Sequence, residues 1–178
     1  MNHAENKVVL HAGEYCFGTA GTHVHTLLGS CISITIWHPV LRIGGMCHFA
    51  LASPEGRSLG SKLDPRYAED CIKLFKRSVG RNGTQLKSYH IKIFGGGNMY
   101  NKHPYQGLDE IENQPIGDKN VAAAATLLMD EGVEILVAHV GEFGYRRIVF
   151  DISTGDVWVR FTPAKGAVGD VRSLRGRV

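Results

Sequence analysis

Alternating hydrophobic and polar positions in the first third of the chain predict two neighbouring β-strands. Ile32, Ile34 and Ile36 alternate with Ser33 and Thr35, which is the period-two pattern of a strand with one buried face. His38-Pro39 ends this strand, and a second apolar run extends over residues 42–51. Because only a short turn separates the two runs, we expect them to pair as an antiparallel hairpin.

A change to helical spacing follows the strands. Asp64-Pro65 predicts a helix start, in which Asp64 is the N-cap and Pro65 occupies the first turn. The apolar stripe expected on this helix consists of Ala68, Cys71, Ile72, Phe75 and Val79. Asp118 is expected to cap a second, alanine-rich helix that stops at Gly132.

Further strands are predicted over residues 86–94, 134–140, 147–152 and 157–160, the last two joined as a hairpin through 153–156. With the strands of residues 7–52, this predicts an α+β fold of layered mixed β-sheets flanked by helices. We expect one domain over 1–178, with its core at about 7–162 and a mobile tail at 164–178.

The composition is that of an ordinary globular domain, and it gives little support for a nucleic-acid-binding, membrane or metal-binding protein. The 178 residues are 43% hydrophobic and 21% charged, as in ordinary globular domains, and the net charge of +3 gives little reason to expect a nucleic-acid partner. No stretch is long and apolar enough to cross a bilayer, and the first residues lack the pattern of an export signal, so we expect a cytoplasmic protein without membrane insertion. The four cysteines form no Cys-x-x-Cys pair, and the histidines show no zinc-ligand spacing, so we expect free thiols and no metal.

The predicted hairpin brings a thiol and an imidazole together. A register with Trp37 opposite Arg42 places Cys31 opposite His48, on the face that also carries Ser33. An imidazole that accepts the thiol proton yields the far more nucleophilic thiolate. Thr26 supplies a hydroxyl that could orient His48 or hold a substrate.

Spacing alone leaves two alternatives open. Cys31 and His48 are either a catalytic pair or a buried thiol beside a hydrogen-bonded histidine. A bulge at Gly44-Gly45 would shift the register and separate them.

Several segments together resemble the chemoreceptor glutamine deamidase CheD family. The resemblance extends from residue 13 to about 161. Its segments are Thr26-Leu27-Leu28-Gly29-Ser30-Cys31, residues 39–46 with His48-Phe49, Lys92-Ile93-Phe94-Gly95-Gly96-Gly97-Asn98-Met99, Ile116-Gly117-Asp118-Lys119-Asn120, and residues 146–151 with Thr154-Gly155. The sequence departs from the family pattern at Cys47, Glu142 and Tyr145, which leaves the role of the loop 141–145 open.

The resemblance implies an enzyme that deamidates glutamine side chains of methyl-accepting chemotaxis receptors and also hydrolyses receptor methyl esters. Its nucleophile, base and third active-site residue match Cys31, His48 and Thr26, although His25 is a neighbouring candidate for the third position. The implied chemistry is a thioester mechanism without metal or cofactor. The implied fold is kin to the cysteine deamidases of the cytotoxic necrotizing factor type.

A second class of function is an interaction module. CheD-like proteins bind CheC-type phosphatases of the same pathway, so the resemblance also implies a protein that mainly binds and regulates such a partner. The two classes differ in what Cys31→Ala does, because an enzyme loses turnover and a pure binding module keeps its function.

Overall fold

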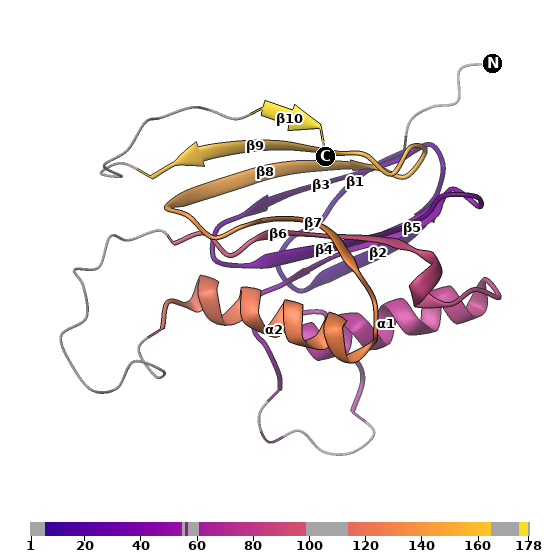
Figure 1. The fold of residues 1–178 in the computed structure, drawn as a ribbon, viewed down its shortest axis with the longest axis horizontal. Coiled ribbons are helices and arrows are strands. Elements are labelled where there is room, and N and C mark those ends of the chain that lie inside the picture. The colour runs from indigo at the N-terminus through magenta and orange to yellow at the C-terminus, as the bar shows by residue number, and fades with distance from the viewer. Residues whose placement is uncertain (1–5, 55, 57–60, 99–113, 165–174, 178) are drawn as a thin grey trace.

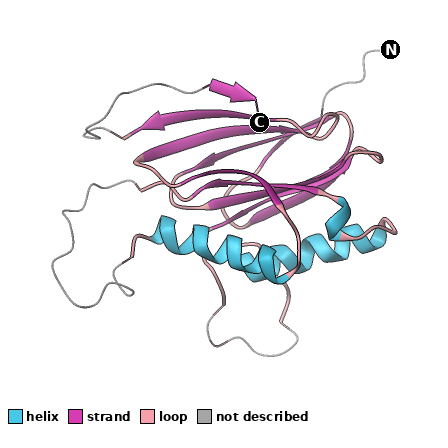
Figure 2. Cartoon of the chain, viewed as in Figure 1, coloured by secondary structure: helices cyan, strands magenta, loops and turns pink. Residues whose placement is uncertain are grey.

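The chain forms two stacked β-sheets with two helices on one outer face. The computed structural model describes residues 6–54, 56, 61–98, 114–164 and 175–177. Figure 1 shows both helices packed side by side against the sheet that contains β4 and β5, while the sheet of β8 and β9 covers that sheet's other face. Figure 2 shows the same division into strand and helix layers. The predicted α+β fold of layered mixed sheets is confirmed.

Each sheet has five strands and is mixed. The first sheet has the order β1 (Asn6–Val9), β3 (Thr22–Leu28), β8 (Gly144–Asp151), β9 (Val157–Pro163) and β10 (Arg175–Arg177). The second has the order β2 (Glu14–Thr19), β5 (Ile43–Phe49), β4 (Ile32–His38), β6 (His90–Gly95) and β7 (Ile135–Val140). Only β1–β3 and β6–β7 pair in parallel among these strands.

The second sheet is buried on both faces. Ile32, Ile34 and Ile36 of β4 join the apolar cluster under the helices, whereas Trp37 packs into the cluster between the sheets. Every residue of β5 is buried. Because side chains alternate along a strand, Ser33 of β4 also faces the layer between the sheets, although it is polar.

The hairpin of β4 and β5 forms, but its predicted register is wrong by two positions. His38 pairs with Ile43, and Ser33 lies opposite His48. The four-residue turn between them is closed by a 2.9 Å hydrogen bond from the Arg42 amide to the His38 carbonyl, with Arg42 at a φ of 50°. A shift of two positions keeps every side chain on its predicted face, and the Gly44-Gly45 bulge does not occur.

Both helices are present, but the predicted caps are wrong. α1 spans Ala68–Arg81, and Asp64 forms an Asx turn instead, accepting a 3.0 Å hydrogen bond from the Arg66 amide. α2 spans Ile116–Asp130, so Asp118 lies within its first turn. The predicted apolar stripe of α1 and the stop at Gly132, which has a φ of 66°, are confirmed. A 3-10 turn, η1 (Leu86–Ser88), precedes β6, which shortens the strand predicted at 86–94.

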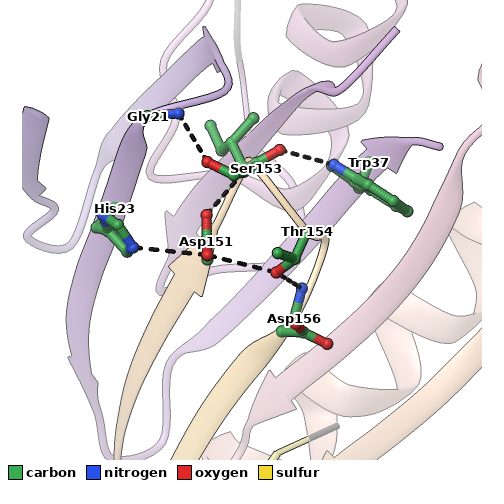
Figure 3. Close-up of polar contacts among 8 residues, drawn as sticks. Gly21, His23, Trp37, Asp151, Ser153, Thr154 and Asp156 are labelled. Carbon is green, nitrogen blue, oxygen red and sulfur yellow. Dashed lines mark hydrogen bonds and ion pairs between the residues drawn. The ribbon is translucent and has the colours of Figure 1, made fainter. Parts of the chain in front are cut away.

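One end of the sandwich is closed by polar contacts around the turn between β8 and β9 (Figure 3). The indole of Trp37 donates a 2.8 Å hydrogen bond to the carbonyl of Ile152 and so ties the second sheet to the first. The Gly21 amide donates to the Ser153 hydroxyl at 2.8 Å. Asp151 lies 3.6 Å from His23. The predicted hairpin through 153–156 is confirmed, and these contacts fix the end opposite to Cys31.

Part of the predicted tail lies outside the described residues. It comprises residues 165–174 and 178 of the tail that the sequence predicts to be mobile. Arg175–Arg177 form β10, which pairs with β9. No helix among the described residues is long and apolar enough to span a membrane.

Candidate active site

Cys31 lies where the chain crosses from the first sheet to the second. β3 ends at Leu28, β4 begins at Ile32, and Cys31 belongs to the short link between them. Its side chain is half-buried and packs against the apolar cluster between the sheets. The free cysteine therefore lies at an end of the sandwich, partly open to solvent.

A glycine run at the end of β6, Gly95-Gly96-Gly97, holds this link. The amide of Gly96 donates to the Cys31 carbonyl and that of Gly97 to the Gly29 carbonyl, both at 2.8 Å. Gly95 has a φ of 112°, and a Cβ there would lie 2.1 Å from the Cys31 carbonyl oxygen. Only glycine lets the two backbones approach so closely.

The loop 141–145 is hydrogen-bonded to the glycine run and to the residue that follows it. The Gly141 amide donates to the Gly95 carbonyl at 2.9 Å, and the Asn98 amide donates to the Glu142 carbonyl at 2.8 Å. Glu142 adopts a φ of 63°. The loop whose role the sequence left open thus supports the segment that carries Cys31.

His48 and Thr26 meet between the sheets. His48 projects from β5 and is 5% exposed, and Thr26 projects from β3 of the facing sheet and is 4% exposed. Thr26 Oγ1 lies 2.8 Å from His48 Nδ1. The same hydroxyl donates a 2.7 Å hydrogen bond to the carbonyl of Leu10. Of the neighbours Thr26 and His25, therefore, Thr26 contacts the imidazole.

These contacts determine which nitrogen of His48 carries hydrogen. A threonine hydroxyl has one hydrogen, and the Leu10 carbonyl can only accept. The hydrogen bond between Thr26 and His48 must therefore be donated by Nδ1–H of the imidazole. In a neutral ring Nε2 is then a bare acceptor, and Nε2 of His48 is buried without a hydrogen-bond partner in the described part of the chain.

Cys31 and His48 share one face of the second sheet but are not hydrogen-bonded. Ser33 lies directly opposite His48, and Cys31 precedes Ile32, the first paired residue of β4, so Cys31 is not the direct partner of His48. Catalytic hydrogen bonds are often long in the absence of substrate and shorten when it binds. The two side chains lie in the same layer between the sheets.

Burial keeps both groups neutral. Desolvation raises the pKa of the Cys31 thiol and lowers the pKa of the His48 imidazole. The Leu10 carbonyl and the Glu14 carboxylate act in the opposite direction on the pKa of His48, but burial dominates. At neutral pH the pair is thus a thiol and an imidazole, not a thiolate and an imidazolium.

The other cysteines have a packing role. Cys47 and Cys71 are fully buried in the core under the helices. Cys16 faces the layer between the sheets, and burial raises the pKa of its thiol to about 11. The prediction that Cys71 is a core residue is confirmed.

Two polar residues near the link were not predicted as important. Asn120 of α2 is 2% exposed and contacts the segment before Cys31. Arg146 of β8 is fully buried, and its Nε donates a 2.8 Å hydrogen bond to Nδ1 of His139. Only the position of Asn120 and Arg146 within the family-like segments could have indicated them.

Comparison with known proteins places the chain in a family. The family described as "CheD chemotactic sensory transduction" matches residues 51–161. The chain belongs to the CheD family. It is 40% identical to a protein of Dechloromonas aromatica named "Probable chemoreceptor glutamine deamidase CheD 3", over 96% of this chain and 95% of that protein. It is 38% identical to a protein of Pseudomonas savastanoi named "Probable chemoreceptor glutamine deamidase CheD", over 97% of this chain and 94% of that protein.

The two kinds of match cover different parts of the site. The family match begins at residue 51 and so includes the glycine run and α2 but not Cys31 or His48. The matches to the two relatives leave out so little of the chain that they extend over β3 with Thr26, the link with Cys31 and β5 with His48. Membership of the CheD family thus rests on nearly the whole chain.

Proposed function

We propose that this protein deamidates specific glutamine side chains of methyl-accepting chemotaxis receptors, with Cys31 as nucleophile, His48 as general base and Thr26 as the residue that orients His48. The observation that carries the proposal is the Thr26–His48 hydrogen bond, because it leaves the buried Nε2 as a free acceptor on the face that carries Cys31. The names of two near-full-length CheD relatives support the same substrate.

The reaction proceeds through a thioester. Cys31 Sγ attacks the carbonyl carbon of the glutamine carboxamide while the thiol proton passes to Nε2 of His48. The tetrahedral intermediate expels ammonia, which takes that proton, and a thioester remains. Water then attacks the thioester, His48 accepts one of its protons, and Cys31 leaves as the thiol. The net change is amide plus water to carboxylic acid plus ammonia.

The neutral state of the resting pair fits this sequence of steps. A thiol with a raised pKa stays protonated until a substrate is present, and an imidazole with a lowered pKa is free to accept a proton at neutral pH. The thiolate therefore forms during attack rather than beforehand.

Two further activities stay predictions. The same steps with methanol as the leaving group hydrolyse a receptor methyl ester. Binding of a CheC-type phosphatase needs no chemistry at Cys31, so the interaction-module hypothesis predicts that Cys31→Ala retains that binding.

The test is incubation of the protein with receptor cytoplasmic fragments, followed by peptide mass spectrometry of amide-to-acid conversion. We expect conversion at defined glutamines by the wild type and none by Cys31→Ala or His48→Gln. Cys16→Ala is the matched control, since Cys16 is a half-buried thiol in the same layer between the sheets, and it should retain conversion. No conversion by the wild type, or equal conversion by Cys31→Ala, contradicts the proposal.

A further inference from the structure

The side chain of Asn120 joins the two segments that carry the thiol and the imidazole. Asn120 lies in the second turn of α2, and its Nδ2 donates two hydrogen bonds. One goes to the Ser30 carbonyl at 3.0 Å and the other to the Ala50 carbonyl at 2.9 Å. Both amide hydrogens are therefore used, and both acceptors are backbone carbonyls.

The two carbonyls lie where the β4–β5 ladder has ended. Its last pair is Ile32 with Phe49, so Ser30 and Ala50 lie beyond the ladder. Ser30 immediately precedes Cys31, and Ala50 follows His48 by two positions. The Asn120 side chain thus connects the two segments just beyond the last backbone pair of the ladder.

The first contact also orients the backbone N–H of Cys31. In a trans peptide the C=O and the following N–H point in opposite directions, and no cis peptide occurs in the described chain. Because the Ser30 carbonyl points to α2, the Cys31 N–H points away from the helix layer. The Cys31 side chain also lies on that side, against the cluster between the sheets.

α2 itself packs closely against the glycine run. A Cβ at Gly117 would lie 2.4 Å from the Gly96 carbonyl oxygen, and a Cβ at Gly96 would lie 2.3 Å from a methyl group of Val121. Helix and glycine run are therefore in direct contact on both sides of Asn120. A side chain on a helix packed this closely can set the distance between two other segments.

We propose that Asn120 is a positioning residue that sets the spacing of Cys31 and His48 and the direction of the Cys31 N–H toward the developing oxyanion. The inference rests on the proposed function for the role of this geometry in turnover. Asn120 touches neither the thiol nor the imidazole, and it acts only through the Ser30 and Ala50 carbonyls.

The first test measures turnover, and it distinguishes a positioning role of Asn120 from a role in the stability of α2. Asn120→Asp keeps the shape but replaces the donor with an acceptor, and Asn120→Ser keeps a single donor if the aspartate variant does not fold. Leu128→Ala is the control, because Leu128 is a fully buried core residue of the same helix, eight positions further on. We expect kcat to fall at least about tenfold in the Asn120 variants with KM nearly unchanged, while Leu128→Ala lowers the thermal midpoint and keeps kcat within about threefold.

The second test needs no receptor substrate and is a double-mutant cycle on thiol alkylation. The rate at which iodoacetamide modifies Cys31 is followed by peptide mass spectrometry, with and without His48→Gln. In the wild-type and Leu128→Ala backgrounds, His48→Gln should slow alkylation by about tenfold; in the Asn120 variants it should change the rate less than about twofold.

The outcomes distinguish this inference from the proposed function. The positioning role is overturned if His48→Gln slows alkylation of Cys31 about tenfold in the Asn120 variants as well. It is also overturned if Leu128→Ala loses as much kcat as those variants do. A wild type that alkylates with coupling but converts no glutamine overturns the proposed function, while the alkylation cycle still decides whether Asn120 sets the spacing.

Discussion

Replacing Thr26 by valine tests how the imidazole is held. Thr26→Val keeps the shape and the buried position but removes the hydroxyl that accepts from His48 Nδ1 and donates to the Leu10 carbonyl. The hydroxyl that favours hydrogen on Nδ1 over hydrogen on Nε2 is then gone. The tautomer with hydrogen on Nε2 cannot accept the proton of Cys31. Turnover should fall while substrate binding changes little.

The magnitude follows from the contacts that remain. One hydrogen bond inside a protein contributes about 0.5–1.5 kcal/mol, and leaving a buried donor unsatisfied costs about 1–3 kcal/mol. The Leu10 carbonyl also lies near enough to the imidazole to raise its pKa, so it partly replaces Thr26 as acceptor. We therefore expect a loss of about 1–2 kcal/mol in transition-state stabilisation, which is about 5- to 30-fold in kcat.

The assay is the initial rate of glutamine-to-glutamate conversion in a receptor fragment. Thr26→Ser is the matched control, because it keeps the hydroxyl, and its rate should stay within about threefold of the wild type. Nitrogen NMR of labelled histidine should show His48 protonated on Nδ1 in the wild type and mixed tautomers in Thr26→Val. A valine variant with wild-type kcat, or a wild type with its hydrogen on Nε2, refutes the reasoning.

Three other predictions concern pH, backbone fit and packing. Burial lowers the pKa values of His48 and His139, so below about pH 6.5 the unfolded chain binds more protons than the folded one and the free energy of unfolding falls on acidification. The thermal midpoint should therefore drop between about pH 7.5 and 5.5, and it should drop less in His139→Gln. A thermal midpoint that does not change with pH contradicts this. Gly95→Ala places a Cβ against the Cys31 carbonyl and should abolish receptor deamidation or folding, and normal activity in a folded variant would show that the link can move. Phe75→Ala empties a fully buried site in the core and should lower the free energy of unfolding in urea by about 3–5 kcal/mol, so a loss under about 1 kcal/mol counts against the packing described.

The sequence predicted those features that depend on local periodicity. The alternation at Ile32–Ile36 identified the faces of β4, and the helical spacing identified the buried side of α1. The hairpin register was missed by two positions because Arg42 takes a left-handed conformation that favours glycine, and nothing in the residue types around Pro39 indicates it. Asp64 failed as a cap because its side chain forms a turn before the helix begins.

Contacts between distant segments could not be read from such patterns. Thr26 and His48 come from different sheets, and their pairing depends on how the two sheets stack. The resemblance to a family named both residues, but the tautomer follows only from the additional Leu10 contact. Asn120 has no local signal at all, because its two partners lie 90 and 70 residues away in the chain.

Trapping with hydroxylamine tests covalent catalysis by Cys31 most directly. A thioester between Cys31 and the substrate glutamine reacts with hydroxylamine as well as with water, so the modified residue becomes a hydroxamate instead of an acid. The account predicts that the wild type and Cys16→Ala form this hydroxamate at the glutamines they deamidate, and that Cys31→Ala and an enzyme-free mixture form none. Continued deamidation by the wild type without any hydroxamate, or hydroxamate formation by Cys31→Ala, would contradict it.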